Sequence, residues 1–289
     1  MRAVVLEAPC RLVVRDVREP RLGRDEMLIR VELASLCGAC AVCAYGKGSV
    51  CHEKRSLGVS MPGAFADLVA IPAGFAHPLP DEIALRDAVL IEPLAVALHA
   101  WRLSEAQADD AVAVIGCGSE GLLLIRFALS RGARVLAADV DRERLALAHQ
   151  LGAARLVQID ADRPSVRLAA QIEADWSPTV IFEAAGAAAA VELALSAVAR
   201  GGRVVLVGRG AQSVPLIPRH FVRRALTLIG SLIYDHPADF VTAIELVRTG
   251  EFTPGTLVSR IAPLTAVADL LDAASRQPGK VVLDVCAAR

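Results

Sequence analysis

A glycine-rich turn, set between an apolar run and a helical pattern, constrains this chain more than any other feature. Residues 111–115 are apolar and rich in β-branched side chains, as in a strand that is buried on both faces. A G-x-G-x-x-G follows at 116–121, and residues 122–129 show the crowded apolar pattern of a buried helix. A second buried strand over 134–138 ends at Asp139. The stretch therefore predicts a strand–turn–helix–strand unit.

Each position of this turn has a physical role in binding a dinucleotide. Gly116 permits the tight turn, Gly118 lets the backbone approach a pyrophosphate, and Gly121 lets the helix pack closely on the strand. The free N–H groups at the start of the helix, at Ser119 and Glu120, face the phosphate charge. Because a predicted strand precedes the glycines and a predicted helix follows them, a dinucleotide site is a better interpretation than a plain glycine turn.

Asp139 indicates which dinucleotide is bound. It follows the fingerprint at roughly the twenty-residue distance at which an acid accepts hydrogen bonds from the adenosine ribose. A carboxylate there repels a 2′-phosphate, which favours NAD over NADP. Arg142 and Arg144 lie just beyond and keep NADP open as the alternative; Arg144 is a further candidate cofactor contact.

From residue 111 onward, short apolar runs alternate with helical stretches. This rhythm predicts an α/β fold with a parallel, doubly wound sheet. Six candidate strands are the number that a complete dinucleotide-binding domain needs. They are 111–115, 134–138, 156–159, 179–184, 203–207 and 226–232.

The rest of the chain has a different pattern. The first part alternates and turns like a small β domain, with strands expected at 3–6, 12–17, 27–33 and 63–72 and a helical approach over 80–100. The tail has two more helices and two more strands. These are expected at 237–249, 266–276, 257–261 and 280–285.

Composition excludes several classes of function. Hydrophobic residues make up 54% of the 289, so a substantial core is available, and the formal net charge is -1. That balance attracts neither nucleic acid nor an anionic membrane. No apolar run approaches the roughly 18 to 20 residues that span a bilayer, and the apolar start is too short for a secretory signal. We expect a cytoplasmic protein that acts on a small molecule.

Four of the seven cysteines cluster. Cys37, Cys40, Cys43 and Cys51 form a C-x2-C-x2-C-x7-C pattern, and in a reducing cytosol such a cluster points to metal rather than disulfides. Four thiolates on one short loop can enclose Zn²⁺ tetrahedrally, which leaves no open coordination position for chemistry. We expect one structural zinc per chain; reduced thiols without metal and an iron–sulfur cluster are the alternatives.

Taken together, these motifs resemble the zinc-containing medium-chain alcohol dehydrogenases, and most closely the sorbitol, threonine and butanediol dehydrogenase branch. The resemblance runs over nearly the whole chain, and the cysteine spacing is its most specific part. Besides the cysteine loop and the glycine fingerprint it rests on Gly63-Ala64-Phe65-Ala66, Glu92-Pro93-Leu94-Ala95, the stretch 180–186 and the stretch 234–240. It implies an NAD-binding Rossmann domain inserted into a GroES-like β domain.

The resemblance also implies a division of the chain. Residues 1–90 would form a truncated GroES-like catalytic domain with its zinc lobe at 37–55, and residues 91–234 the NAD-binding domain. Residues 235–289 would return to the catalytic domain. Two subunits would pair along the last strand, 226–232, because an exposed apolar edge is otherwise a liability, so we expect a homodimer or homotetramer.

The chain departs from this family at the catalytic metal. The resemblance implies a zinc held by a cysteine in an I-C-G-[ST]-D-like stretch and by a G-H-E further on, with the cysteine loop after both. Here Cys37-Gly38 serves as the start of both motifs, Ala39 replaces the proton-relaying hydroxyl, and no G-H-E is present. Glu92 remains as a nearby acid, but a catalytic site uses three protein ligands. We therefore expect no catalytic zinc.

Without that zinc, the substrate oxygen needs another polarising group and another proton route. The candidates are Glu92, Ser35, Tyr45 and His52. His77 and His99 are conceivable metal ligands, but a strand end and a buried ring bonded through one nitrogen are the simpler interpretations. Glu183 and Cys117 are interpreted as structural.

Two functions fit these features. The first is an NAD-dependent oxidoreductase acting on an alcohol, polyol or ketone, in which hydride transfer is the chemistry of the nicotinamide itself. The second is a non-redox role: a dinucleotide-binding sensor or partner subunit, or a lyase or isomerase that uses bound NAD transiently. The intact fingerprint favours the first, and the lost catalytic ligands motivate the second.

Overall fold

The computed structural model describes most of the chain. The described residues are 2–8, 11–16, 18, 26–29, 34–35, 37–46, 48–66, 68–160, 166–274 and 277–284. Within them no helix combines the length and the apolar character needed to cross a membrane.

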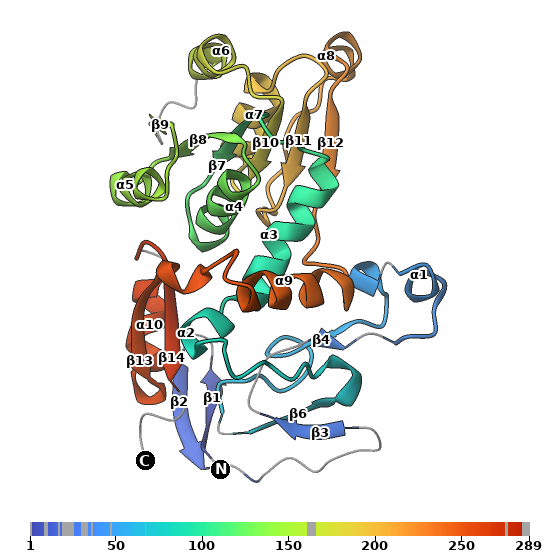
Figure 1. Ribbon diagram of the computed structural model, residues 1–289, viewed down its shortest axis with the longest axis vertical. Coiled ribbons are helices and arrows are strands. Elements are labelled where there is room, and N and C mark those ends of the chain that lie inside the picture. Colours follow the sequence, from blue (N-terminus) through green and yellow to red (C-terminus); the bar gives the residue numbers. More distant parts are fainter. Residues whose placement is uncertain are drawn as a thin grey trace.

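A six-stranded parallel sheet forms the upper part of the molecule (Figure 1). Its strand order is β12-β11-β10-β7-β8-β9, so the chain starts in the middle, builds outward to one edge and then to the other. The strands are β7 (Ala111–Ile115), β8 (Arg134–Asp139), β9 (Arg155–Gln158), β10 (Val180–Glu183), β11 (Arg203–Leu206) and β12 (Thr227–Gly230). This is the order of a complete dinucleotide-binding sheet.

Helices cover both faces of this sheet, which explains why its central strands are apolar throughout. Along β7, Val112 and Val114 belong to one hydrophobic cluster, and Ala113 and Ile115 to the other. Each fully buried valine or isoleucine contributes about 1.5–3 kcal/mol. The helices between the strands are α4 (Ser119–Ser130), α5 (Arg142–Gln150), α6 (Val166–Asp175), α7 (Ala188–Ala197) and α8 (Pro218–Arg224).

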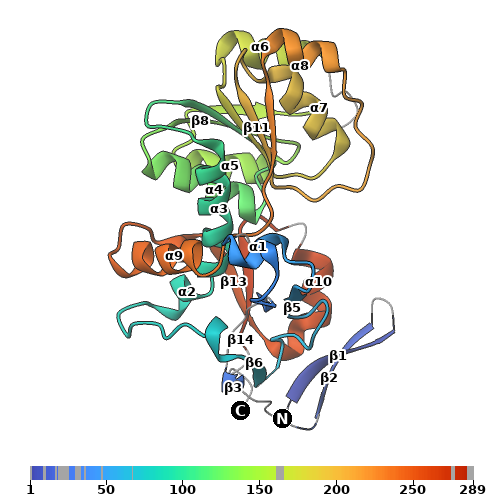
Figure 2. The ribbon, with the colours of Figure 1, turned by 90° about the vertical axis from the view of Figure 1, so that its right-hand side faces the viewer.

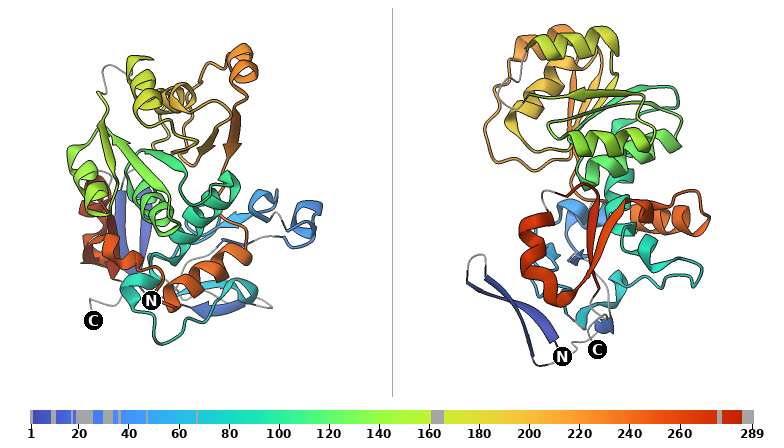
Figure 3. Two further views of the ribbon diagram at one scale, coloured as in Figure 1. Left: turned by 45° about the horizontal axis from the view of Figure 1, so that its top comes forward. Right: turned by 90° about the vertical axis from the view of Figure 1, so that its left-hand side faces the viewer.

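The lower part is built from short two-stranded sheets. β1 (Arg2–Ala8) pairs with β2 (Arg11–Asp16), β3 (Glu26–Ile29) with β6 (Val69–Pro72), and β4 (Ala34–Ser35) with β5 (Arg55–Ser56), all antiparallel. From the tail, β13 (Val258–Pro263) and β14 (Lys280–Asp284) pair in parallel and lie with α10 (Val267–Ala274) near the β1–β2 hairpin (Figure 3). The tail of the chain therefore lies beside its beginning.

Two segments connect the parts (Figure 2). The first is α3 (Ile91–Ser104), a long helix that begins in the lower part and ends beside the sheet. The second is the segment 231–237, which leads from β12 down to α9 (Ala238–Arg248). α3 packs against both α4 and α9, so the first connection contacts the helix to which the second connection leads.

Short helices fill the lower part. These are α1 (Ala41–Ala44), η1 (Gly48–Val50), η2 (Ala73–Phe75), α2 (Leu85–Ala88), η3 (Pro254–Leu257) and η4 (Leu264–Ala266).

The predicted α/β fold and the six sheet strands are confirmed, with ends that shift by a residue or two. Two expectations were wrong in extent. The strand expected from residue 63 begins at Val69, with Ala66 forming only an isolated bridge to Ala3, and the helix expected over 80–100 is two helices separated by Val89 and Leu90. The expected strand end at 30–33 lies outside the described residues. The domain boundaries at 90 and 234 stay predictions.

Candidate dinucleotide and metal sites

The glycine fingerprint lies at the carboxyl end of β7 and has no room for side chains where the backbone folds on itself. A Cβ on Gly121 would lie 1.8 Å from the carbonyl oxygen of Gly116, and a Cβ on Gly116 would lie 2.6 Å from the nitrogen of Ala185. At Gly118 the reverse holds, because a Cβ there would meet nothing within 4 Å. The turn is therefore closed towards the protein and open at the position where a pyrophosphate approaches.

The carboxylate of Asp139 is held beside this turn. It is only 4% exposed; Oδ2 accepts the N–H of Cys117 at 2.6 Å, and Oδ1 accepts the N–H of Asp141 at 2.8 Å. A carboxylate has about four acceptor positions, so two remain for ribose hydroxyls. Arg144, in the first turn of α5, lies near enough for its charge to act on Cys117. The site thus joins the fingerprint to the acid and the arginine, and it fits a dinucleotide.

A second carboxylate lies inside the turn. Glu120 is in the first turn of α4, and its Oε1 is 3.6 Å from Nζ of Lys280, the first residue of β14. Its Oε2 is buried and has no hydrogen-bond partner among the described residues. Burial raises the pKa of Glu120, and the charge of Lys280 opposes that rise. A charge from the tail of the chain therefore reaches the phosphate-binding turn.

Glu183 and Cys117, interpreted above as structural, have structural contacts. Glu183 is fully buried, and its Oε1 accepts the N–H groups of Ala185 and Gly186 at 2.9 and 2.8 Å, which shapes the turn after β10. Burial raises the pKa of the Cys117 thiol to about 12, so this thiol stays protonated. Neither group is positioned as a reactant.

The four clustered cysteines converge as the sequence predicts. Their Sγ atoms lie 3.5 Å apart for Cys40–Cys43 and Cys51–Cys37, 3.8 Å for Cys40–Cys51 and 3.9 Å for Cys37–Cys43. A tetrahedral Zn²⁺ with Zn–S bonds of about 2.3 Å separates its sulfurs by about 3.8 Å. The donor set and its spacing fit a closed zinc site, with all four positions taken by protein.

The negative charge of ionised cysteine sulfurs is the reason that this arrangement needs a cation. Backbone N–H groups at Ala39 and Cys40 lower the pKa of the Cys37 thiol to about 6, so this sulfur ionises easily. Desolvation and the neighbouring sulfurs raise the pKa of Cys43 to about 12. Four sulfurs at these distances cannot all be thiolates without a positive charge among them, and zinc supplies it.

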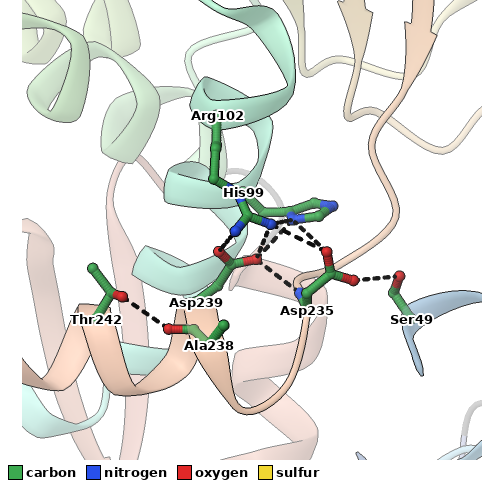
Figure 4. A network of polar contacts seen from close by, with 7 residues as sticks. All are labelled: Ser49, His99, Arg102, Asp235, Ala238, Asp239 and Thr242. Atoms are coloured by element: carbon green, nitrogen blue, oxygen red, sulfur yellow. Dashed lines mark hydrogen bonds and ion pairs between the residues drawn. The ribbon is translucent and has the colours of Figure 1, made fainter. Parts of the chain in front are cut away.

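The cysteine lobe is tied to the connection between the two parts of the molecule (Figure 4). Ser49, in η1, donates from Oγ to Asp235 Oδ1 at 3.0 Å, and Arg102 of α3 donates to the other oxygen of Asp235 at 3.1 Å. Asp239, at the start of α9, is 1% exposed and accepts from His99 Nδ1 at 2.7 Å and from the backbone N–H of Asp235 at 2.8 Å.

A second group of possible metal ligands consists of His99, Asp235 and Asp239. A positively charged side chain already occupies the place of a cation beside its carboxylates. The guanidinium of Arg102 contacts Asp235 at 3.1 Å and Asp239 at 3.2 Å, so a protein cation already offsets one of the two negative charges. The cluster is an ion-pair network that joins α3 to α9. The expectation that His99 is a buried ring bonded through one nitrogen is confirmed.

The remaining candidate zinc ligands also have other partners. His77 Nε2 lies 2.8 Å from His236 Nε2, and burial lowers the pKa of both rings, that of His236 to about 4. Both imidazoles are therefore neutral at pH 7, one donating and the other accepting. Within the described residues, no group of three possible ligands includes Glu92.

Glu92 lies in the first turn of α3, and a lysine that sequence reasoning overlooked lies near it. Lys54 follows Cys51 by one turn, with its N–H bonded to the Cys51 carbonyl at 3.2 Å, and it is half-buried. Burial and the charge of Arg209 lower the pKa of Lys54, while the charges of Cys51 and Glu92 raise it. Glu92 and Arg209 therefore each lie close enough for their charge to act on Lys54.

Comparisons with known proteins agree with this geometry. Residues 121–249 match the family model described as zinc-binding dehydrogenase. The 2-dehydro-3-deoxy-L-galactonate 5-dehydrogenase of Pseudoalteromonas atlantica is 32% identical over 235 residues, which are 80% of this chain and 67% of that protein. The chain belongs to the zinc-containing medium-chain dehydrogenase family. It is an oxidoreductase by class.

Other members of the family are similar over most of the chain. The sorbitol dehydrogenase of Bacillus subtilis is 27% identical over 249 residues, 85% of this chain and 70% of that protein. The solved alcohol dehydrogenase TADH from Thermus sp. ATN1 superposes with a TM-score of 0.89 at 27% identity, over 99% of this chain and all of that one.

The other catalytic candidates of this dehydrogenase lie on the cysteine lobe. Ser35 pairs with Arg55 between β4 and β5. Tyr45 ends α1 and is 82% exposed, and His52 is exposed in the turn after Cys51. Lys54 was not predicted from the sequence, because it belongs to no recognised motif. Its position two residues after His52, which was a candidate, could have drawn attention to it.

Proposed function

We propose that the protein is an NAD-dependent dehydrogenase that transfers hydride between a nicotinamide and an alcohol, polyol or ketone, without a catalytic zinc. The observation that carries the proposal is the phosphate-binding turn, open only at Gly118, with Asp139 beside it. Membership of a dehydrogenase family supports the reaction class.

Asp139 supports NAD over NADP. Both of its oxygens accept backbone N–H groups at 2.6 and 2.8 Å, so the carboxylate cannot swing away from a 2′-phosphate. A fixed negative charge at that position repels the phosphate and accepts the ribose hydroxyls. Arg144 offsets part of this repulsion, which leaves some use of NADP.

A nicotinamide bound here would accept a hydride from the carbinol carbon of the substrate, and the hydroxyl proton would pass to a base, so that the alcohol becomes a carbonyl. The developing negative charge on the substrate oxygen needs a positive partner. In this proposal Lys54 provides that charge, and Glu92 favours its charged form, because the negative charge of Glu92 raises the pKa of Lys54. A zinc held by Cys37, Cys40, Cys43 and Cys51 would stabilise the lobe that carries Lys54.

The absence of a catalytic zinc is supported by the ligands. All six histidines are described; His77 and His99 have partners of their own, and within the described residues Glu92 belongs to no three-ligand group. Cys37 is the one cysteine that the family pattern would supply, and its sulfur lies 3.5 Å from Cys51 inside the cage.

Purified protein should contain one zinc per chain and form NADH from at least one member of a panel of alcohols and polyols, with a lower rate when NADP replaces NAD. Absorbance at 340 nm follows the turnover, and elemental analysis of the same sample counts the metal. NAD binding without turnover on any substrate would favour a sensor, a partner subunit or an isomerase. Two zinc ions per chain would contradict the metal-free cleft.

Lys54→Met should lower kcat about a hundredfold, the usual effect of removing one preorganised charge from a developing oxyanion. Lys54→Arg keeps the charge and should retain more activity than Lys54→Met. The lowered pKa of Lys54 means that its ammonium is lost at lower pH than the usual value of about 10.4. Activity should therefore fall on the alkaline side below that pH. Unchanged kcat with one zinc present would exclude this role.

We also propose that two copies pair along β12, giving a dimer or tetramer. The edge of the sheet carries exposed apolar side chains nearby, among them Leu216, Ile217 and Val222, and an apolar pocket lined by Val191, Leu206 and Leu228. Exposed apolar surface at a strand edge favours association. Sedimentation as a monomer would contradict the pairing. A cytoplasmic location and a small-molecule substrate complete the proposal.

A further inference from the structure

The phosphate-binding turn contains a negative charge that a phosphate site does not need. Glu120 is in the first turn of α4, where free N–H groups attract anions. Its Oε1 is bound to Lys280 at 3.6 Å, while Oε2 is buried without a hydrogen-bond partner among the described residues. A bound dinucleotide brings two further negative charges to the same turn.

Lys280 connects this turn to the lower part of the molecule. It begins β14, where it pairs with Val258 of β13, and its carbonyl accepts the hydroxyl of Ser259 at 3.3 Å. The backbone of Lys280 is therefore fixed in the tail, and only its side chain reaches the turn. The ammonium group that pairs with Glu120 can also pair with a pyrophosphate oxygen, so the two anions would share a single positive charge.

We propose that Glu120 competes with the dinucleotide pyrophosphate for Lys280, so that Glu120 weakens dinucleotide binding when it is ionised and releases Lys280 when it is protonated. The inference rests on the proposed dinucleotide function and names a regulating residue of that site. Glu120 is a positioning residue, because it acts through Lys280.

The proposed competition makes the affinity for NADH depend on pH in one direction. Lowering the pH protonates Glu120, frees Lys280 and removes a like charge, so affinity for NADH should rise as the pH falls. Burial raises the pKa of Glu120, which brings this change towards the neutral range. Lys280 is the charged group that acts on Glu120 among the described residues, and Cys117 in the same turn stays protonated because its pKa is about 12.

The test is NADH binding to the full-length protein, followed by nucleotide fluorescence between pH 5.5 and 8.5. Glu120→Gln should bind NADH about tenfold more tightly than the unmodified protein at the alkaline end, which corresponds to about 1.4 kcal/mol. The difference between the two proteins should become smaller towards the acidic end. Lys280→Gln should weaken binding, and adding Glu120→Gln to it should raise the affinity less than Glu120→Gln does alone, because the part that acts through Lys280 is lost.

Glu143→Gln is the matched control, since it makes the same change in the first turn of α5 at an exposed position. It should leave the affinity and its pH profile unchanged. If Glu120 is only a structural ion-pair partner, Glu120→Gln binds NADH equally or more weakly, and the inference fails alone. If the unmodified protein binds no dinucleotide at any pH, the proposed function fails with it.

Discussion

Replacing Cys51 with serine should leave the protein without zinc and unfold the cysteine lobe, while the six-stranded sheet stays folded. Cys51 is the buried member of the four cysteines, at 6% exposure, and its sulfur lies 3.5 Å from that of Cys37. A serine hydroxyl does not ionise at neutral pH, so the cage would be one anionic ligand short. Elemental analysis after dialysis should find almost no zinc.

The expected effect is large because the lobe has little other stabilisation. Structural zinc contributes about 10–16 kcal/mol of apparent binding free energy in small domains that fold around it. In the described part of the lobe, Tyr45 and Val50 are exposed rather than packed in a core. Limited proteolysis should therefore cleave the variant within residues 37–56, and circular dichroism should show the α/β signal retained.

His52→Ala is the control for this experiment. His52 is exposed beside Cys51, and the variant should keep one zinc per chain, because a four-sulfur cage needs no histidine. Retention of zinc by Cys51→Ser together with its loss from His52→Ala would overturn the closed cage. Iron and a visible chromophore in the unmodified protein would instead favour an iron–sulfur cluster.

The features that the sequence predicted well are local in the chain. β7 and β8 were evident because a strand covered on both faces must be apolar at every position. The cysteine cage was evident because its ligands fall within one loop. Asp139 was evident because the distance along the chain from the fingerprint to the acid is fixed by one helix and one strand.

The features that the sequence concealed join distant segments. His99 and Asp239 lie 140 positions apart, and no spacing in the sequence indicates that the two side chains meet. Lys280 and Glu120 meet because the tail returns to the turn, which no local pattern specifies. His52 and Tyr45 were plausible catalytic candidates by residue type, but type alone does not reveal that both are exposed on the lobe.

The cysteine lobe is hydrogen-bonded to the segments that connect the two parts of the molecule. Ser49 lies in η1, directly before Cys51, and its hydroxyl bonds Asp235 in the segment that leads from β12 to α9. Asp235 shares Arg102 with Asp239, and Arg102 belongs to α3, the other connection. A zinc in the cysteine cage would thereby be linked through Ser49 to both segments that connect the two parts.

Asp239→Asn should destabilise the protein by about 3 kcal/mol, because removing one partner of a buried charged network leaves the others unsatisfied. Oδ2 of Asp239 accepts from both His99 Nδ1 and the N–H of Asp235, at buried or half-buried positions. The amide lacks the negative charge that stabilises these contacts, and its NH2 group would replace the oxygen that Arg102 contacts at 3.2 Å. The contribution of Arg102 is smaller, since that side chain is half exposed and water can replace its contact. Urea denaturation measures the change in the free energy of unfolding.

Glu245→Gln, on the same helix, is the appropriate control, because its exposed pair with Arg248 is of the kind that adds little stability. It should leave the unfolding curve unchanged. The network also predicts a second effect: at a denaturant concentration where Asp239→Asn remains folded, its turnover should be lower than that of the control, because α3 carries Glu92 at one end and His99 two turns later. Loss of stability with unaltered turnover would limit the network to folding. Equal stability of Asp239→Asn and Glu245→Gln would mean that water, rather than His99, satisfies the carboxylate, which its 1% exposure argues against.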